Sequence, residues 1–468
     1  MTVLFQSLPM SEIATVVHGT VAGKLNARLR DVQVDSRLCS SGSLFVALEG
    51  ENTDGHLFVE DAFRRGSSLS FISRQYYGLH RDSIDKICVK YRSAVVAVDR
   101  PITALQLLAR AHLGSLDPTI VGITGSNGKT TTKELLGAMI GGWAQVMMSP
   151  GNYNSDIGVP LASFSVTPDD RYAVFEMGTN RPGEIAELVS TVQPSVAAVT
   201  GVANAHLGAF GSLRGIAEEK RAVFAHVCNE GRGFVPEADP MRSVLTAGIE
   251  GCVEFFGSEA TAGFAGSRNL GLNGVEIDLD GEQVRSPLSG DHQLGNILCA
   301  VSIARYLGVP GEQIRAGISM VQPGFARGQV LRGRKTIYLD CYNANRESVL
   351  RAIETVESIS WTGRKILVLG SMKELGDASV DEHRVVGRAA AASEAEKVYF
   401  FGEEAAVAYR AAAESRPAAV CWHDSFDSLA DSIAGGLEDG DLVLLKGSRS
   451  TALERLVPII DPDLQVVG

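Results

Sequence analysis

The sequence predicts an α/β protein of three domains, in which helices cover mostly parallel sheets. The chain has 468 residues, which is more than one hydrophobic core normally serves. Short apolar runs alternate with segments of helical periodicity along most of it, the pattern of parallel sheets wrapped in helices. We expect a small α/β domain at 1–98, a central domain with a mostly parallel sheet at 99–325 and a Rossmann-like domain at 326–468.

Composition and charge exclude several classes of protein. The chain is 45% hydrophobic and 21% charged, which is ordinary for a soluble globular protein. A formal net charge of −12 without any Lys/Arg-rich run argues against nucleic-acid binding, which needs basic stripes to neutralise phosphates. The opening residues lack the basic region and cleavage site of a signal peptide, and no apolar run approaches the roughly 18 residues of a membrane helix. We therefore expect a cytoplasmic protein with no membrane span.

The cysteines indicate a reducing compartment. There are seven of them, at scattered positions, and none forms a Cys-x-x-Cys motif. An odd number of unclustered cysteines is typical of reduced thiols in the cytoplasm, not of a disulfide framework or a zinc site. We expect free thiols throughout.

The first 98 residues have the texture of a small α/β domain. Short β-rich runs lie at 32–34, 44–48, 69–72 and 94–98. A helical stretch lies at 59–65, and a helix at about 102–113 leads out of the domain. Ser36 and Arg37 place a hydroxyl beside a guanidinium directly after a strand, which suits a phosphate or a uracil edge. The alternative is a plain structural domain.

A glycine-rich turn between a strand and a helix is the strongest chemical signal in the chain. The apolar run 120–123 predicts a buried strand, and a helical pattern runs from Thr130 to about Met139. Between them stands Gly125-Ser126-Asn127-Gly128-Lys129. Glycines let backbone N–H groups face inward, and the helix N-terminus adds partial positive charge, so the turn forms an anion trap.

The side chains around this turn point to a nucleoside triphosphate. Lys129 can place its ammonium on the outer phosphates, Thr130 can offer a hydroxyl to Mg²⁺, and Thr131 follows it. Gly125 and Gly128 are closer together than the glycines of the usual P-loop, so the loop is a tighter variant. The alternative is a helix-capping turn with a surface lysine.

Two further polar residues follow predicted strands of the same domain. Glu176 ends the run 172–175, and His206 follows the run 196–200. Ligands of open α/β sheets sit beyond the carboxyl ends of the strands, where the P-loop also lies. A carboxylate and an imidazole near a threonine hydroxyl and phosphates can hold a divalent metal. Each residue alone could equally be an ordinary polar group on a loop.

A lysine lies on the apolar side of a predicted helix. The helix spans 212–227 with Ser212 as its N-cap, and Lys220 falls on the stripe that contains Ile216 and Val223. An inward lysine is costly unless its pKa falls. A neutral amine can react with CO₂ to give a carbamate, which is an oxygen ligand for a metal. The alternative is a lysine that snorkels at the helix edge.

The next segments supply polar residues to the end of the central domain. Residues 231–290 are Gly-rich and predict an edge hairpin. It leads into a helix at 295–307, near whose start His292 and Asn296 share one face. Residues 320–335 predict a linker with Arg327 exposed at its end.

The remainder of the chain repeats the α/β rhythm. Its predicted strands lie at 336–339, 365–369, 397–401 and 441–445. No Gly-x-Gly-x-x-Gly follows the first of them, so no nicotinamide cofactor is predicted. Asp340, the segment 342–345 and the segment 446–449 place polar groups on one rim.

These motifs together resemble the Mur ligase family, over nearly the whole chain. The resemblance rests on the segments 122–130, 151–160, 176–178, 204–212, 340–345, 374–376 and 446–450. The short Gly-x-x-Gly-Lys-Thr loop is the family's own version of the P-loop. One departure is Arg346, which stands where the family usually has proline after Asn-Ala-Asn.

The resemblance implies a set of binding residues. ATP would be held by Gly125, Ser126, Asn127, Gly128, Lys129, Thr130 and Thr131, with Asn296 at the adenine and Arg327 and Asp340 reaching the nucleotide. One Mg²⁺ would be bound by Thr130 and Glu176, and a second by His206 and a carbamoylated Lys220. The substrates would contact Ser36, Arg37, Asn152, Asn154, Lys446 and Ser448.

The resemblance also implies an activity. The chain is similar to the family's ATP-dependent ligases that add D-alanyl-D-alanine to UDP-N-acetylmuramoyl-tripeptide. Those enzymes work through an acyl phosphate, in peptidoglycan precursor synthesis. Lys129, Glu176, His206 and Lys220 would be the catalytic residues, and the enzyme would be a monomer. The alternatives are another amino-acid ligase of the Mur or folylpolyglutamate type, and a nucleotide-switched binding protein without ligase chemistry.

Overall fold

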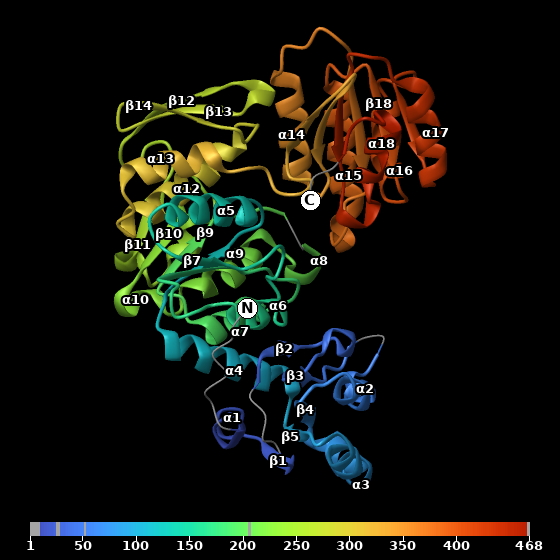
Figure 1. Ribbon diagram of the computed structural model, residues 1–468. Helices are drawn as coiled ribbons and strands as arrows, with labels where there is room; N and C mark the ends of the chain where they lie inside the picture. The colour runs from blue at the N-terminus through green and yellow to red at the C-terminus, as the bar shows by residue number, and fades with distance from the viewer. Residues whose placement is uncertain (1–9, 25–28, 51–52, 205–206, 466–468) are drawn as a thin grey trace.

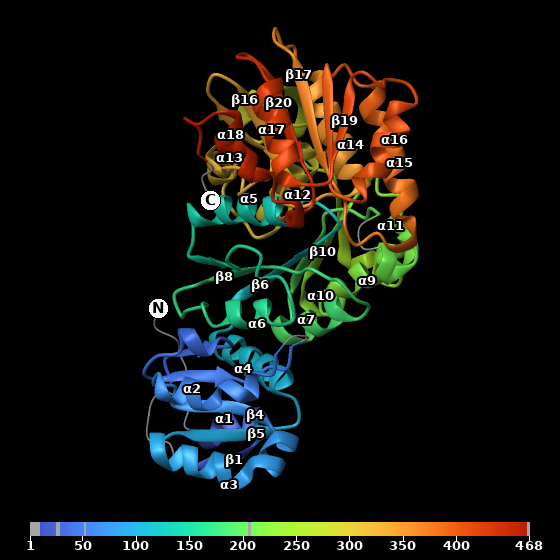
Figure 2. The ribbon, with the colours of Figure 1, turned by 90° about the vertical axis from the view of Figure 1, so that its right-hand side faces the viewer.

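The computed structural model describes all residues except 1–9, 25–28, 51–52, 205–206 and 466–468 (Figure 1). Three lobes follow one another along the chain, coloured blue, teal to yellow, and orange to red (Figure 1). In the turned view the blue lobe lies at one end, and the other two lie against each other (Figure 2). Within the described residues, every helix is too short or too polar to cross a membrane.

The first lobe is built on a five-stranded sheet in the order β1-β5-β4-β3-β2, with only β1 antiparallel to its neighbour. Its strands are β1 (Thr20–Gly23), β2 (Asp31–Gln33), β3 (Ser43–Val46), β4 (Leu69–Ser73) and β5 (Ala94–Val98). Its helices are α1 (Met10–Val16), α2 (Val59–Arg64) and α3 (Arg74–Tyr91). The predicted strands and the helix at 59–65 are therefore confirmed.

Helix α4 (Pro101–Leu116) connects the first lobe to the second. Leu105 and Leu108 pack into the core beneath β3, β4 and β5, and the same cluster contains Phe164 of the second lobe. A single helix thus contributes apolar side chains to both lobes, and it is covered on its other side by α6 (Gly158–Ser163) and α7 (Glu184–Val192).

The second lobe contains a six-stranded sheet in the order β11-β10-β9-β6-β8-β7, and all of its pairings are parallel. The strands are β6 (Thr119–Thr124), β7 (Val146–Met148), β8 (Tyr172–Glu176), β9 (Val196–Val199), β10 (Arg232–Pro236) and β11 (Val253–Phe256). One face packs on α5 (Lys129–Gly141), α12 (His292–Tyr306) and α13 (Gly311–Met320), and the other on α6, α7 and α9 (Leu213–Arg221). Successive strand residues alternate between these two cores.

The prediction for 231–290 was wrong in part. Strands β10 and β11 belong to the parallel central sheet, on either side of α11 (Arg242–Thr246). Only the later part is antiparallel, as a separate sheet of β12 (Phe264–Asn269), β13 (Val275–Leu279) and β14 (Glu282–Ser286). Strand β10 was not predicted because its apolar run is short. Only Phe234 and Val235 in it are buried apolar side chains, and Gly233 precedes them.

The third lobe has a six-stranded sheet in the order β15-β16-β20-β17-β18-β19, with only β15 antiparallel. Its strands are β15 (Gln329–Arg332), β16 (Thr336–Asp340), β17 (Lys365–Gly370), β18 (Lys397–Phe401), β19 (Val420–His423) and β20 (Leu442–Lys446). Its helices are α14 (Arg346–Ser358), α15 (Ser379–Ala392), α16 (Ala405–Ala413), α17 (Phe426–Gly436) and α18 (Val457–Ile460). Strand β15 lies inside the predicted linker, and β19 was not predicted.

The predicted helix at 212–227 is broken into pieces. Helix α9 ends at Arg221, a 3₁₀ turn follows at Ala222–Phe224, and α10 spans Val227–Glu230. The predicted cap is confirmed, since the Ser212 hydroxyl accepts a hydrogen bond from the N–H of Gly215 at 3.0 Å. The apolar stripe continues through the break, because the 3₁₀ turn still buries Val223 and Phe224.

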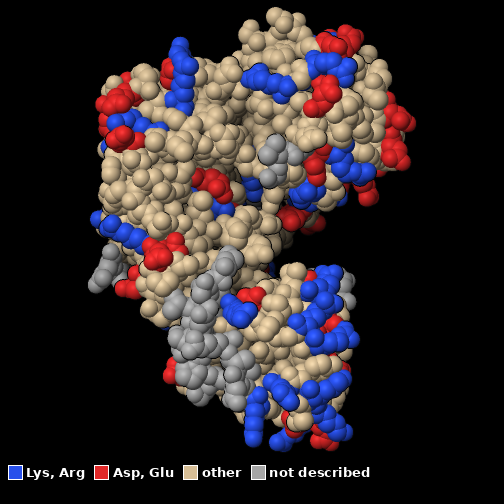
Figure 3. All heavy atoms as spheres, in the orientation of Figure 1, with Lys and Arg blue, Asp and Glu red and all other residues tan. Residues whose placement is uncertain are grey.

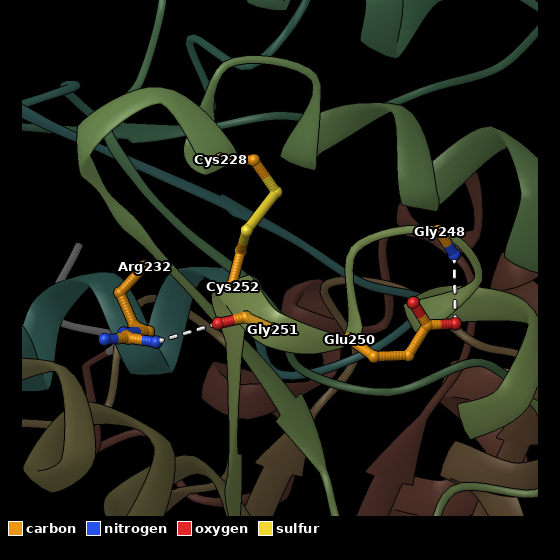
Figure 4. The surroundings of a disulfide bond; sticks show 6 residues. All are labelled: Cys228, Arg232, Gly248, Glu250, Gly251 and Cys252. Atoms are coloured by element: carbon orange, nitrogen blue, oxygen red, sulfur yellow. Dashed lines mark hydrogen bonds between the residues drawn. A yellow bond between two sulfur atoms is a disulfide. The ribbon is translucent and has the colours of Figure 1, made fainter.

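The expectation of free thiols throughout was wrong for one pair. Cys228 in α10 and Cys252 before β11 form a disulfide, with their Cα atoms 5.4 Å apart (Figure 4). Because β10 and β11 are parallel neighbours, the segments that enter them start at the same edge of the sheet. There Arg232 also donates to the carbonyl of Gly251 (Figure 4). The other five cysteines are free.

Candidate active site

The turn after β6 leaves no room for side chains at its two glycines. A Cβ atom on Gly125 would lie 1.9 Å from Oγ1 of Thr200, and one on Gly128 would lie 2.0 Å from Oδ1 of Asn296. Gly128 also has a φ of +83° as the residue that precedes α5. The turn can therefore approach both neighbours closely, and the first N–H groups of α5 remain available to an anion.

A cavity of about 380 Å³ opens beside this turn, between the second and third lobes. It is lined by most of the residues predicted to bind nucleotide or substrate: Ser126, Asn127, Gly128, Lys129, Thr130, Thr131, Asn152, Asn154, Glu176, Asn296, Arg327, Asp340 and Lys446. The structure therefore brings together side chains from both lobes that lie far apart in the sequence.

Thr130 and Glu176 meet at the base of the cavity. Oγ1 of Thr130 donates to Oε2 of Glu176 at 2.7 Å, and Nδ2 of Asn154 donates to Oε1 of the same carboxylate at 2.8 Å. Glu176 is buried, with 1% of its surface exposed. A carboxylate and a hydroxyl are oxygen donors of the kind that Mg²⁺ prefers, and Mg²⁺ commonly uses only one or two protein ligands together with phosphate oxygens. The residues present fit that ion.

Two lysines near the phosphate-binding turn, Lys129 on α5 and Lys220 on α9, have lowered pKa values. Nζ of Lys129 donates to the carbonyl of Gly125 at 2.8 Å, and burial lowers the pKa of its ammonium. Burial, together with the nearby charge of Lys129, lowers the pKa of Lys220 to about 7. Lys220 is 3% exposed, so the predicted inward position is confirmed and the snorkelling alternative is not.

The neighbour of Lys220 is engaged elsewhere. The carboxylate of Glu219 accepts from the N–H groups of Gly183 and Ile185 at 2.7 and 2.8 Å, at the start of α7. Among the described residues no group of three His, Cys, Asp or Glu side chains could hold a metal. His206, the other predicted metal ligand, lies outside the described residues.

The third lobe presents a connected set of polar groups to the cavity. Nζ of Lys446 contacts Oδ2 of Asp340 at 2.8 Å and donates to the carbonyl of Asn343 at 2.9 Å. The guanidinium of Arg327 lies over the ring of Tyr342, 3.7 Å from its centroid. Arg327 was predicted to be exposed, but this stacking leaves it half-buried.

Several predicted residues lie away from the cavity. Ser36 donates to Asp61 at 2.9 Å and Arg37 pairs with Asp35, both in the first lobe, and neither residue lines the cavity. The hydroxyl of Ser448 is buried and accepts from the N–H of Lys373 at 3.0 Å. Figure 3 shows Lys and Arg side chains gathered along one side of the first lobe.

Sequence reasoning missed three residues that shape the site. Gln293 accepts from Nδ2 of Asn296 at 2.8 Å and so orients it. Arg351 of α14 lines both this cavity and a second one of about 670 Å³ on the far side of the P-loop. Lys133 of α5 is fully buried. The available signals were helical spacing, since Arg351 lies three residues after Ser348, and Lys133 lies four residues after Lys129.

Arg346 is an ion-pair partner within the third lobe. Its Nη1 lies 2.9 Å from Oε1 of Glu382, a buried carboxylate on α15. Burial raises the pKa of Glu382, whereas Arg346 lowers it. The arginine therefore ties the start of α14 to α15 and is not among the residues that line the cavity.

Comparison with known proteins matches all three lobes to one family. The Mur ligase family catalytic domain matches residues 28–113, the Mur ligase middle domain matches 123–304, and the Mur ligase glutamate ligase domain matches 326–449. The chain is 36% identical to the UDP-N-acetylmuramoyl-tripeptide--D-alanyl-D-alanine ligase of Treponema pallidum, over 97% of this chain and 99% of that one.

Solved structures agree with this match. MurF from Acinetobacter baumannii superimposes with a TM-score of 0.86 at 27% identity, covering 96% of this chain and 98% of that one. MurF from Thermotoga maritima in complex with ADP superimposes with a TM-score of 0.77 at 28% identity, covering 93% of this chain and 97% of that one.

Proposed function

Because this chain belongs to the Mur ligase family, we propose that it is the ATP-dependent ligase that joins D-alanyl-D-alanine to UDP-N-acetylmuramoyl-tripeptide. One observation carries the proposal: a single cavity joins the P-loop of the second lobe to the polar rim of the third. A ligase of this kind must bring ATP, a carboxylate and an amine to one place, and residues of both the second and the third lobe line this cavity.

The reaction needs no nucleophilic side chain. The terminal carboxylate of the tripeptide attacks the γ-phosphorus of ATP, the bond to the bridging oxygen breaks, and ADP leaves. The amine of D-alanyl-D-alanine then attacks the acyl carbon and loses a proton, the carbon–oxygen bond breaks, and inorganic phosphate leaves. The protein's task is to place two anions side by side, which requires positive charge and orientation.

The P-loop would supply both the positive charge and the orientation that the reaction needs. Its N–H groups and the start of α5 would face the phosphates of bound ATP, and Lys129 could exchange its bond to the Gly125 carbonyl for the γ-phosphate. Asn296, Arg327 and Asp340 line the same cavity and would hold the adenine and ribose. Lys446 is already committed to Asp340 and to the Asn343 carbonyl, so we propose that it orients these groups.

Thr130 and Glu176 would hold one magnesium ion, and Lys220 as a carbamate, with His206, would hold a second. Bound magnesium would neutralise phosphate charge that otherwise repels the attacking carboxylate. Lys220 suits the modification because a pKa of about 7 leaves much of its amine neutral, and only the neutral amine adds CO₂.

The rest of the substrate would lie along the molecule. Asn152 and Asn154 line the cavity near Glu176 and would contact the peptide, while Ser36 and Arg37 in the first lobe would contact the UDP end. The basic side of the first lobe suits a diphosphate (Figure 3). We propose that the enzyme works as a monomer in the cytoplasm.

Phosphate release tests the proposal directly. The purified enzyme is given ATP, Mg²⁺ and UDP-N-acetylmuramoyl-tripeptide, with D-alanyl-D-alanine, single amino acids, glutamate or no acceptor. We expect rapid release only when the dipeptide is the acceptor. The tripeptide is supplied in two forms, with diaminopimelate or with lysine as its third residue, and the faster form identifies the substrate. Release with a single amino acid would favour another Mur-type or folylpolyglutamate-type ligase. Release that needs no peptide substrate would favour a nucleotide-switched binding protein.

A further inference from the structure

Lys133 is a fully buried cation on the same helix as the phosphate-binding residues. It lies one helical turn after Lys129 on α5, and 0% of its surface is exposed. Isolated buried charges are expensive and are normally found only where other groups satisfy them. A lysine in this position therefore needs a structural reason.

All three N–H donors of Lys133 have acceptors. Nζ donates to the carbonyl of Ser149 at 2.7 Å and to the carbonyl of Gly151 at 3.2 Å, and it lies 3.1 Å from Oε1 of Glu134. An ammonium has three donors and no acceptor, so this arrangement is complete. Two of the three partners belong to the backbone of one loop, residues 149–154, which we call the asparagine loop.

The asparagine loop is also joined to the metal-binding carboxylate. The hydroxyl of Ser149 accepts from the N–H of Glu176 at 3.1 Å, and the carbonyl of Asn154 accepts from the N–H of Gly178 at 2.8 Å. The side chain of Asn154 donates to Glu176 at 2.8 Å. The loop therefore contacts Glu176 through both Ser149 and Asn154, and Lys133 binds the backbone of the same loop.

We infer that Lys133 is a positioning residue, which fixes the asparagine loop on the P-loop helix and thereby sets Glu176 and Asn154 against the nucleotide. The start of α5 then carries three functions: Lys129 for phosphate, Thr130 for the Glu176 contact and, one turn later, Lys133 for the loop. The kinetic part of this inference rests on the proposed function.

The test compares Lys133→Met with the wild type and with Glu134→Gln. Methionine keeps an unbranched side chain of similar length but leaves the Ser149 and Gly151 carbonyls without their donor. Glu134→Gln removes the charged partner and leaves both carbonyl contacts in place. Hydrogen exchange of the peptide that spans 148–156 is measured first, because it does not depend on turnover.

We expect amide exchange in the asparagine loop to rise about tenfold or more in Lys133→Met and to stay unchanged in Glu134→Gln. In phosphate release, kcat of Lys133→Met should fall at least about tenfold, while the Kd for a non-hydrolysable ATP analogue stays within about threefold. A purely structural role would instead weaken analogue binding and kcat together. Unchanged loop exchange with kcat within twofold of the wild type would overturn the inference.

A second variant, Lys133→Gln, keeps the test decisive if Lys133→Met does not fold. Lys133→Gln keeps two N–H donors on a shorter side chain, so it should show the same changes at smaller size if Lys133→Met is unfolded. Equal exchange in Lys133→Gln and the wild type would overturn the inference. If the wild type releases no phosphate with tripeptide and dipeptide, the proposed function fails, and the exchange comparison still decides the role of Lys133.

Discussion

Nδ2 of Asn345 donates to Oδ1 of Asn127 at 3.0 Å, across the boundary between the third lobe and the P-loop. Asn345 is at the same time the N-cap of α14, because its Oδ1 accepts from the N–H of Ser348 at 2.9 Å and the Ser348 hydroxyl in turn accepts from the Asn345 N–H. One side chain therefore starts a helix of the third lobe and joins that lobe to the nucleotide cradle.

The Asn345 contact predicts a separable effect of two substitutions. Asn345→Ala loses both the helix cap and the hydrogen bond between the lobes. The free energy of unfolding should therefore fall by about 1 kcal/mol, and KM for ATP should rise. Asn345→Ser keeps a good cap but cannot reach Asn127, so it should raise KM without the loss of stability. Urea denaturation and initial rates measure the two effects. An Asn345→Ser enzyme with unchanged KM would show that the contact between lobes does not assist nucleotide binding.

Replacing Lys129 should stop the reaction and leave the fold intact. The ammonium donates to the Gly125 carbonyl, and among the described residues it forms no salt bridge, so its loss breaks no ion pair there. Losing one such electrostatic contact to a transition state typically costs about 3–4 kcal/mol of barrier. We expect Lys129→Ala to unfold at the same temperature as the wild type and to release ADP at under a hundredth of its rate. Turnover above a tenth of the wild type would contradict the role of Lys129.

Lys220 is predicted to act as a carbamate. Lys220→Ala should be inactive, and a short-chain carboxylic acid such as acetate or propionate should partly restore phosphate release by occupying the space of the carbamate oxygens. Lys129→Ala is the matched control, because its defect should not respond to carboxylic acids. A Lys220→Ala enzyme that stays active, or that no acid rescues, would remove the carbamate from the mechanism.

The same modification predicts how activity depends on pH. With the pKa of Lys220 lowered to about 7, the neutral amine that adds CO₂ becomes scarce as the pH falls below 7. In degassed buffers, phosphate release should therefore drop from pH 8 to pH 6, and added bicarbonate should restore part of it at pH 6. The Lys220→Ala enzyme should show no bicarbonate effect. An identical response of both enzymes would mean that CO₂ acts elsewhere.

His383 predicts a pH dependence of stability. Its Nε2 accepts from the N–H of Met372 at 3.0 Å and its Nδ1 contacts the carbonyl of Ser379 at 2.7 Å, so the buried ring is neutral. Burial lowers its pKa from the ordinary value of 6.5. Below about pH 6.5 the unfolded chain binds a proton that the folded chain does not, so stability falls with falling pH.

The urea midpoint should therefore be lower at pH 5.5 than at pH 7.5. In His383→Gln the Met372 N–H loses its acceptor, so the midpoint at pH 7.5 should fall, and the difference between the two pH values should shrink. Some difference should remain, because burial lowers the pKa of His112 in the same direction. A variant with the full pH difference of the wild type would show that His383 does not titrate on unfolding.

The sequence alone determined the parts of this protein that depend on neighbours along the chain. Strand β6, the glycine turn and the start of α5 follow one another without a gap, so their order predicts an anion-binding cradle. The placement of Glu176 at the end of β8 could be predicted for a related reason. In parallel sheets, strand ends gather at one edge, whatever the order of the strands.

The tertiary structure decided every contact between segments that are distant in sequence. Asn345 and Asn127 are 218 residues apart, and the partners of Lys133 are 16 and 18 residues away. The disulfide of Cys228 and Cys252 depends on the parallel pairing of β10 and β11, which glycine-rich composition concealed. Hydrophobic periodicity reports which face of an element is buried, but which element covers that face depends on packing of the whole chain. That packing turned a helical lysine into the anchor of the asparagine loop.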